Sequence, residues 1–236
     1  MIDVPAWLPA GLQPQPARLV GCQILPNAEP HLRARLGCGE GHTSLGFVTA
    51  DQDDSTYAAL DHATKFARVD VVYAKSFYAG AAHASGPLSG EILGVLAGPD
   101  PDEVAEGLAA LRDYLDRKAC FYMPAQGSHK SAFFPHVISE TGQYLSRLAG
   151  IAPGEPLAYL IAPPIEAMVA IDAALKAADV ELKQFFGPPT ETNFAGVYLT
   201  GALYACEAAA AAFAQAVVDV ARSPLAGSRR VDRARG

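Results

Sequence analysis

The sequence lacks the patterns that identify most enzymes and metal-binding proteins. It contains no G-x-S-x-G, G-x-G-x-x-G or G-x-x-x-x-G-K-[ST] pattern, so no nucleophile elbow, dinucleotide fingerprint or phosphate-binding loop is indicated. None of its six histidines forms an H-x-x-H or H-E-x-x-H pair, and we expect no metal and no cofactor. The four cysteines are far apart, with no C-x-x-C pair. This spacing excludes a zinc knuckle or a disulfide framework and indicates reduced, mostly buried thiols.

Long hydrophobic runs are also missing. No apolar stretch approaches the roughly 20 residues that a membrane-spanning helix needs. The first twenty residues have neither the basic region nor the continuous apolar region of a signal peptide. They contain four prolines, which favour an extended N-terminal arm over residues 1–17.

Positive charge is scarce except at the C-terminus. The net charge is −7, but residues 222–236 carry five Arg and one Asp, which leaves −11 on the rest of the chain. An acidic body of this kind argues against nucleic-acid binding and favours small cations as partners. The Arg-rich stretch over residues 223–236 also contains Gly, Ser and Pro, and we expect it to be a disordered tail.

What the chain does contain is an internal repeat, which indicates a duplicated domain. The phrase "ALDHATKFARVDV" at 59–71 returns as "AIDAALKAADVEL" at 170–182, with six of thirteen positions identical. In each copy a helical pattern is followed at once by an alternating, strand-like one. The full order, strand-helix-strand-helix-strand-strand-helix, occurs twice. We therefore predict an α/β (α+β) fold with one domain over 18–118 and a second over 119–222.

Alanine dominates the last predicted helix, near Leu203–Arg222. Alanine favours helices and allows close packing, but each residue buries little apolar area. Such a helix needs a broad surface to pack on, and we expect much of that surface to be an interface between subunits. A membrane-active helix is disfavoured because acidic residues interrupt its face and it has no basic stripe.

The repeated phrase resembles the hallmark of bacterial microcompartment shell domains, roughly A-x-D-x-x-x-K-A-A-x-V-x-L. Two copies in one chain are similar to the tandem-domain shell proteins, most closely the L-type shell proteins of ethanolamine-utilisation compartments. The stretches that carry the likeness span both copies: ADQDDSTY at 50–57, SFYAGAAH at 76–83, SGE at 89–91, APPIEA at 162–167 and ETN at 191–193.

The resemblance implies a fold, an assembly and a location. Each copy would be a permuted shell domain, with a four-stranded antiparallel sheet flanked by helices. Three chains would form a pseudohexagonal tile, since two similar domains under threefold symmetry give six similar edges. Such tiles pack edge to edge with other shell proteins around a cytoplasmic polyhedral organelle. Their pores, which can be gated, pass small metabolites such as ethanolamine.

Two lysines occupy the same position in the two copies. Lys65 and Lys176 match the edge lysine of the family, which lies along the seam between neighbouring tiles. A long aliphatic stem can cover apolar surface there while the ammonium donates to carbonyl groups. The alternative is a surface lysine that pairs with Asp61 or Asp172, four residues earlier in each helix.

A second set of residues matches the pore side of the L-type proteins. By resemblance, Asp53, Asp54 and Glu91 would line a small pore within each subunit, with Thr192 and Phe194 on the facing loop. A carboxylate pairs with an ammonium, a hydroxyl can bind an alcohol, and an aromatic ring favours a cation. The set therefore suits ethanolamine, although helix capping also explains Asp53 and Asp54.

Two other functions compete with the shell interpretation. One is a soluble binding or sensor protein in which two duplicated domains clamp a cationic ligand; it would be a monomer or dimer and would not form tiles. The other is an enzyme that uses Asp53 or Glu91 as an acid or base, which would require a carboxylate with a perturbed pKa in a dry pocket. The paired lysines and the Ala-rich helix favour the non-enzymatic shell protein.

Overall fold

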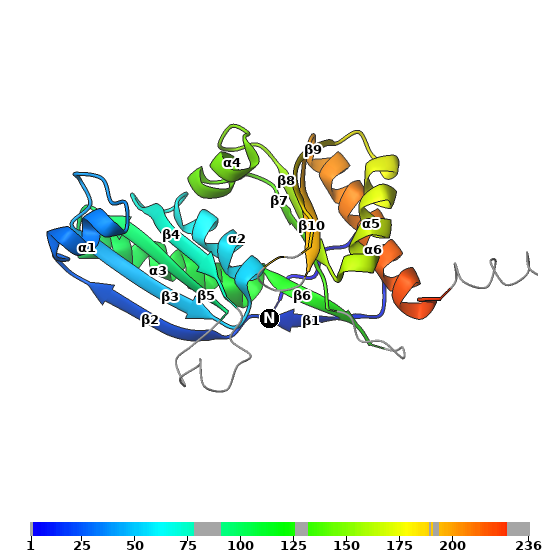
Figure 1. The fold of residues 1–236 in the computed structure, drawn as a ribbon, viewed down its shortest axis with the longest axis horizontal. Coiled ribbons are helices and arrows are strands. Elements are labelled where there is room, and N and C mark those ends of the chain that lie inside the picture. The colour runs from blue at the N-terminus through cyan, green and yellow to red at the C-terminus, as the bar shows by residue number, and fades with distance from the viewer. Residues whose placement is uncertain (1, 78–90, 126–131, 189, 191–193, 226–236) are drawn as a thin grey trace, which may run out of the picture. The chain divides into compact units, whose positions relative to one another are not determined.

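The computed structural model describes residues 2–77, 91–125, 132–188, 190 and 194–225. Within these residues the secondary-structure elements follow one another as β1 (Leu12–Pro16), β2 (Leu19–Leu25), α1 (Pro30–Arg35), β3 (Ser44–Ala50), α2 (Asp53–Ala63), β4 (Asp70–Ser76), β5 (Ile92–Gly98), α3 (Pro101–Arg117), β6 (Cys120–Pro124), β7 (Phe134–Ile138), α4 (Gln143–Ala149), β8 (Leu157–Ala162), α5 (Pro164–Ala177), β9 (Glu181–Phe186), β10 (Ala195–Thr200) and α6 (Leu203–Arg222) (Figure 1).

The chain packs into two compact units. The first unit comprises Met1–Asp3, Pro16–Cys120 and Ile138–Glu155, and the second comprises Val4–Gln15, Phe121–Val137 and Pro156–Gly236. The units therefore exchange segments relative to the two sequence copies. In particular, α4 belongs to the second copy by sequence but packs within the first unit, against α2 and β4.

The first unit is built on an antiparallel sheet with strand order β2-β3-β5-β4. Helices α2 and α3 pack on one face of this sheet. Gly46 allows the close approach of α3, because a Cβ there would lie 2.7 Å from Val104 Cγ1. A second apolar cluster consists of Ala28, Leu45 and two residues of β5, Val95 and Ala97. The core thus lies on both sides of the sheet.

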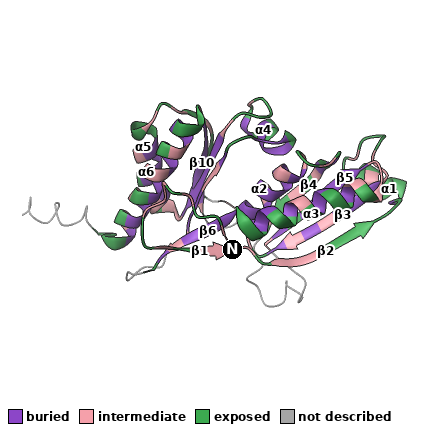
Figure 2. Ribbon diagram, turned by 180° about the vertical axis from the view of Figure 1, so that it is seen from behind, coloured by how far each residue is buried: buried purple, intermediate pink, exposed green. Residues whose placement is uncertain are grey.

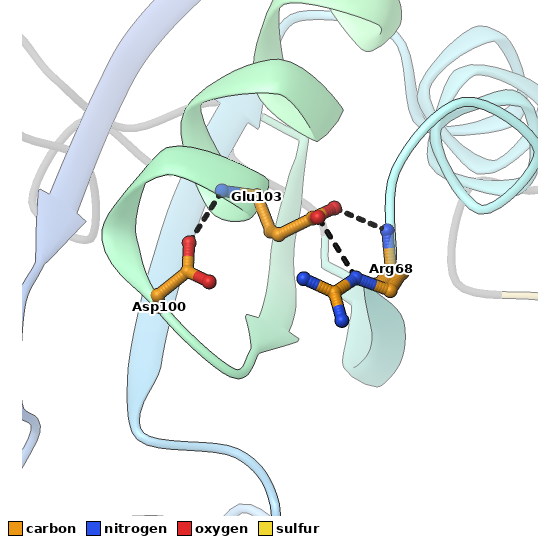
Figure 3. A network of polar contacts seen from close by, with 3 residues as sticks. All are labelled: Arg68, Asp100 and Glu103. Carbon is orange, nitrogen blue, oxygen red and sulfur yellow. Dashed lines mark hydrogen bonds and ion pairs between the residues drawn. The ribbon is translucent and has the colours of Figure 1, made fainter.

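A polar network fixes the start of α3 in the first unit. The Oδ1 atom of Asp100 accepts the backbone N–H of Glu103 at 2.9 Å, which is the usual N-cap arrangement. The Glu103 carboxylate in turn accepts the backbone N–H and the Nε–H of Arg68, at 2.7 and 2.8 Å (Figure 3). The capped helix is thereby joined to the turn that precedes β4.

The second unit repeats this topology with strand order β7-β8-β10-β9. Helices α5 and α6 pack on each other and on β8 and β10. Aromatic rings cross the sheet in the same order as its strands: Phe134, Tyr159, Tyr198 and Phe186, with centroids 4.6–5.3 Å apart. Edge-to-face pairs of this kind add stability beyond their buried area.

Contrary to the expectation from the sequence, one helix, α6, is long and apolar enough to cross a membrane by length and composition alone. One side of it is buried in the second unit, including Cys206, Phe213 and Val217. Figure 2 shows this helix divided lengthwise into buried and exposed faces. Its apolar character is therefore that of a core helix of a globular unit.

Most of the predicted architecture is confirmed. Both copies follow the predicted order of strands and helices, and each builds a four-stranded antiparallel sheet with helices. The sequence did not reveal β1 and β6, which form a separate two-stranded sheet. The expectation of mostly buried cysteines was wrong for half of them: Cys120 and Cys206 are buried, whereas Cys22 is exposed and Cys38 is intermediate. Residues 226–236 of the predicted tail lie outside the described residues.

Candidate functional site

Three carboxylates gather where strand β3 ends and helix α2 begins. Asp53 and Asp54 occupy the first turn of α2 and are 7% and 6% exposed. The backbone of Glu91 is held between neighbouring strands: its N–H donates to Ala50 O at 2.7 Å, and its carbonyl accepts from Phe77 N at 2.9 Å. The first unit thus brings together all three of its predicted pore acids.

Burial makes the charged form of Asp53 costly. Loss of hydration raises the pKa of its carboxyl from 3.8 to about 6, although the backbone N–H of Asp54 donates to its Oδ1 at 2.9 Å. The negative charge of Glu91 raises this pKa further. The pKa of Glu91 is itself raised, first by burial and then by the charge of Asp51. A cation near this cluster would favour the charged forms of Asp53 and Glu91 and would therefore lower both pKa values.

Ser76 and Tyr57, which were not predicted from the sequence as site residues, lie beside Asp53. The backbone N–H of Ser76 donates to the Tyr57 hydroxyl at 2.9 Å, which ties the end of β4 to α2. Hydrogen bonding to the side chain of Ser76 lowers the pKa of Asp53, which partly offsets its burial. Tyr57 follows Asp53 by one helical turn, so its spacing could have indicated a role beside the acids.

The remaining predicted pore residues belong to the second unit. The carbonyl of Phe194 accepts the hydroxyl of Thr190 at 2.9 Å. Its ring packs at 5.9 Å from that of Phe121, so Phe194 is partly covered within its own unit. Thr192 lies outside the described residues.

The two repeated lysines have different surroundings. Lys65 Nζ donates to the carbonyl of Glu140 at 2.7 Å. Partial burial lowers the pKa of Lys65, and the charge of Asp61 partly offsets this effect. Lys176 instead forms an ion pair with Asp172, four residues earlier, at 2.7 Å, with both side chains exposed. Repetition in the sequence therefore does not mean equal contacts in the folded chain.

Asp61 has a structural role that the sequence did not indicate. It is buried, and its carboxylate oxygens accept the backbone N–H groups of Gly142 and Leu145 at 2.6 and 2.7 Å. It thereby caps α4 although the bonded residues are 81 and 84 positions apart in the sequence. The only sequence signal was its place in the repeated phrase.

Metal binding finds no support in the described part of the chain. There, no group of three or more His, Cys, Asp and Glu side chains is arranged to hold a metal ion. His62, for example, has aromatic neighbours and not metal ligands: its ring centroid lies 4.3 Å from that of Tyr114 and 4.5 Å from that of Phe66. Burial lowers its pKa to about 4, and its surroundings are aromatic.

Comparison with known proteins shows the family of the chain. No protein-family model matches it. It is 54% identical over 207 residues to the bacterial microcompartment shell protein EutL of Clostridium perfringens, covering 88% of this chain and 95% of that protein. The EutL of Salmonella typhimurium is 50% identical over 196 residues, covering 83% of this chain and 84% of that protein.

A solved structure agrees with these sequence matches. The crystal structure of the ethanolamine utilization protein EutL from Leptotrichia buccalis superposes with a TM-score of 0.86 at 53% identity, covering 90% of this chain and 98% of that one. Identity of this level over nearly the whole length extends to both copies of the repeat. The chain therefore belongs to the EutL family of bacterial microcompartment shell proteins and is a structural shell component, not an enzyme.

Proposed function

We propose that the chain forms a homotrimeric, pseudohexagonal tile whose pores pass small metabolites, ethanolamine first among them. Support comes from the duplication: two units with the same strand order, repeated by threefold symmetry, give a ring of six similar parts. The tile packs edge to edge with other shell proteins. Assembly of such a tile requires no catalytic residues, which agrees with the lack of the catalytic sequence patterns named above.

The buried acid cluster is the single observation that carries the choice of metabolite. Asp53 and Asp54 are almost fully buried, and Glu91 lies close enough to raise the pKa of Asp53. Burial and the negative charge of Glu91 both disfavour the ionised form of Asp53, and an ammonium ligand would offset that cost. Ethanolamine carries an ammonium and a hydroxyl on a two-carbon chain. The assignment of Thr192 and Phe194 to the same pore stays a prediction from the sequence.

Isothermal titration calorimetry with ethanolamine tests this assignment. Asp53→Asn and Glu91→Gln keep the shape of each side chain and remove its charge. A charge-assisted hydrogen bond contributes roughly 1.5–3 kcal/mol, so each change should weaken binding by about one to two orders of magnitude. Glu106→Gln, on the exposed face of α3, is the matched control and should bind as the unchanged chain does. Equal affinity in all four proteins would exclude the acid cluster as the binding site.

The lysines at the ends of the repeated helices are the proposed edge residues. Lys176 is exposed and its ion pair with Asp172 is a surface pair, which contributes only a few tenths of a kcal/mol. Little is therefore lost when its ammonium turns to a carbonyl on a neighbouring tile. Lys65 donates to the carbonyl of Glu140 within its own chain, and a backbone carbonyl is the type of acceptor proposed for a lysine at the seam.

Electron microscopy of assembled protein tests the edge role. Lys176→Asp should abolish extended sheets while the trimer persists in solution. Lys183→Asp is a suitable control, because Lys183 also pairs with a nearby acid, Glu181, but lies on strand β9. Sheets that form normally with Lys176→Asp would contradict the edge assignment.

A further inference from the structure

The last residue of β4 lies beside the acid cluster of the first unit. Strands β3, β5 and β4 are neighbours in its sheet (Figure 1). Ser76 ends β4 and pairs with Ile92, the first residue of β5, while Ala50 at the end of β3 pairs with Ile92 from the other side. Glu91 precedes Ile92 in the chain. The register of the strands therefore fixes where Ser76 and Glu91 lie relative to each other.

Tyr57 holds Ser76 through the backbone of that residue. Phe77 donates its N–H to Glu91 O at 2.9 Å, on the β5 side of the strand. Successive N–H groups of a strand point to opposite sides, so the N–H of Ser76 points away from β5, and Tyr57 Oη accepts it at 2.9 Å. The ring of Tyr57 stacks on that of Tyr144 in α4, with centroids 6.3 Å apart. Tyr57 is thus fixed at its ring and at its hydroxyl group.

The side chain of Ser76 joins Tyr57 to Asp53. It forms hydrogen bonds with both residues. Burial is the main cause that raises the pKa of Asp53 to about 6, and the hydrogen bond from Ser76 acts in the opposite direction. Burial also raises the pKa of Tyr57, so its hydroxyl stays protonated. Because a serine hydroxyl donates one hydrogen bond and accepts two, Ser76 can donate to the Asp53 carboxylate while it accepts the O–H of Tyr57.

The titratable groups on the elements packed against α2 are mainly acids and tyrosines. Helix α2 packs against α3, α4, β4 and β5. The groups that act on one another around its first turns are Asp51, Asp53, Asp54, Tyr57, Glu91 and Tyr144. From α3, Tyr114 faces Asp61 and His62, later in α2. The charge of Glu91 raises the pKa of Asp53, whereas Ser76 favours the charged form of Asp53.

Two basic residues of neighbouring segments, Lys75 and Arg18, are exposed. Lys75 precedes Ser76 in β4, so its side chain points to the opposite face of the strand. The guanidinium of Arg18 pairs with Asp51 at 3.5 Å, on the surface. Water and salt screen such exposed charges. The state of Asp53 therefore depends on its burial, on Glu91 and on the hydrogen bonds that it accepts.

We infer that Ser76 and Tyr57 are positioning residues for the ligand of the acid cluster: Tyr57 fixes Ser76, and Ser76 holds the Asp53 carboxylate in its charged form for a cation. The inference rests on the proposed binding of ethanolamine at that cluster. Neither residue has to touch the ligand. A carboxylate that Ser76 holds attracts an ammonium group, whereas a protonated carboxyl has no charge to offer it.

Binding is then linked to the proton of Asp53. Aliphatic ammonium groups titrate near about pH 10, so the ligand keeps its charge between pH 5 and pH 7.5. Asp53 titrates within this range, because its pKa is about 6. At the acid end of the range the ligand has to displace the proton of Asp53. The dissociation constant for ethanolamine should therefore rise about tenfold from pH 7.5 to pH 5.

Isothermal titration calorimetry with ethanolamine at pH 7.5, 6 and 5 tests the role of Ser76. Ser76→Ala removes the hydroxyl and should raise the pKa of Asp53 by roughly one unit, the usual size of such a hydrogen bond. Affinity should then fall about fivefold at pH 6 and less than about twofold at pH 7.5. Ser76→Thr keeps the hydroxyl and should restore the original pH profile. A purely structural role would weaken binding equally at every pH.

The role of Tyr57 is tested in the same titrations. Tyr57→Phe keeps the ring that stacks on Tyr144 and removes the acceptor of the Ser76 N–H. It should shift the pH profile in the same direction as Ser76→Ala. Because Tyr57 acts through Ser76, the double variant should bind no more weakly than Ser76→Ala alone. Tyr204→Phe, on a tyrosine that is 77% exposed on α6, is the matched control and should bind as the unchanged chain does.

Urea unfolding without ligand separates this inference from the proposed function. Burial disfavours the charge of Asp53, so Asp53→Asn should gain stability as the pH rises toward the folded-state pKa of Asp53. In a Ser76→Ala background this pKa is higher, and the gain should continue to grow to a pH about one unit higher. The same extension is expected, to a smaller degree, in a Tyr57→Phe background.

The outcomes distinguish the two proposals. Binding profiles and stability profiles that neither Ser76→Ala nor Tyr57→Phe moves along the pH axis would overturn the inference and leave the binding site standing. No binding of ethanolamine by the unchanged protein at pH 7.5 would contradict the proposed function, and the urea profiles would still decide whether Ser76 and Tyr57 act on Asp53. Circular dichroism identifies a variant that fails to fold, and the other variant then decides.

Discussion

Replacement of Asp53 by Asn should stabilise the protein while it removes a binding group. The carboxyl is buried, and its pKa rises from 3.8 to about 6. At 1.36 kcal/mol per pKa unit, this rise corresponds to a cost on the order of 3 kcal/mol for holding the charge in the folded state. Asn keeps an oxygen that can accept the N–H of Asp54, but a buried amide has a cost of its own. We expect a gain of about 2 kcal/mol at pH 7.5.

The sign of the pH dependence follows from linkage. Between about pH 4 and pH 6 the folded state of the unchanged protein binds more protons at Asp53 than the unfolded state does. The contribution of Asp53 to stability therefore falls as the pH rises through this window. The advantage of Asp53→Asn should grow over the same window, be complete above about pH 6 and vanish below about pH 4.

Urea unfolding followed by circular dichroism measures this difference. The titrations are run at several pH values and one protein concentration, because assembly also contributes to apparent stability. Glu106→Gln serves as the control, since Glu106 is exposed on α3, and should change stability little at every pH. A loss of stability in Asp53→Asn at pH 7.5, or a gain that does not vary with pH, would refute the reasoning.

Three further predictions concern the contact between α2 and α4 and the half-buried His62. Asp61→Ala leaves two buried N–H groups without acceptors and should cost about 2–4 kcal/mol in urea unfolding. Asp172→Ala, at the equivalent position of the second copy, breaks an exposed ion pair and should cost less than about 0.5 kcal/mol. Equal costs would contradict the capping role of Asp61. Gly142→Ala should destabilise by roughly 1–3 kcal/mol through overpacking, which the melting temperature would show. His62, whose pKa burial lowers to about 4, should make stability fall as the pH drops from about 6.5 to 4; His62→Phe should flatten this part of the pH profile, and an unchanged profile would assign the loss elsewhere.

The order of the elements could be predicted because it depends on local patterns. Helical periodicity in "ALDHATKFA" and alternation in "VDVVY" are properties of short stretches, and the repeat supplied a second reading of each. The extra strands β1 and β6 could not be found in this way. They pair across more than 100 residues, and Leu12–Pro16 contains two prolines, which normally argue against a strand.

The contacts of the site were harder to predict than its residues. Asp53 and Asp54 are adjacent in sequence, and the resemblance indicated that Glu91 would join them. Nothing in the sequence showed that Asp61 and Lys65 contact residues 140–145, because those contacts depend on the exchange of α4 between the two copies. The same phrase therefore holds a helix in one copy and remains exposed in the other.

The solution mass of the unchanged protein is the most direct test of the trimeric tile. Size-exclusion chromatography with light scattering over a tenfold dilution gives this mass independently of shape. We expect about three times the chain mass of 24.7 kDa, unchanged on dilution. A mass of one chain at all concentrations would contradict the trimer, because a single chain supplies only two of the six similar units of the tile.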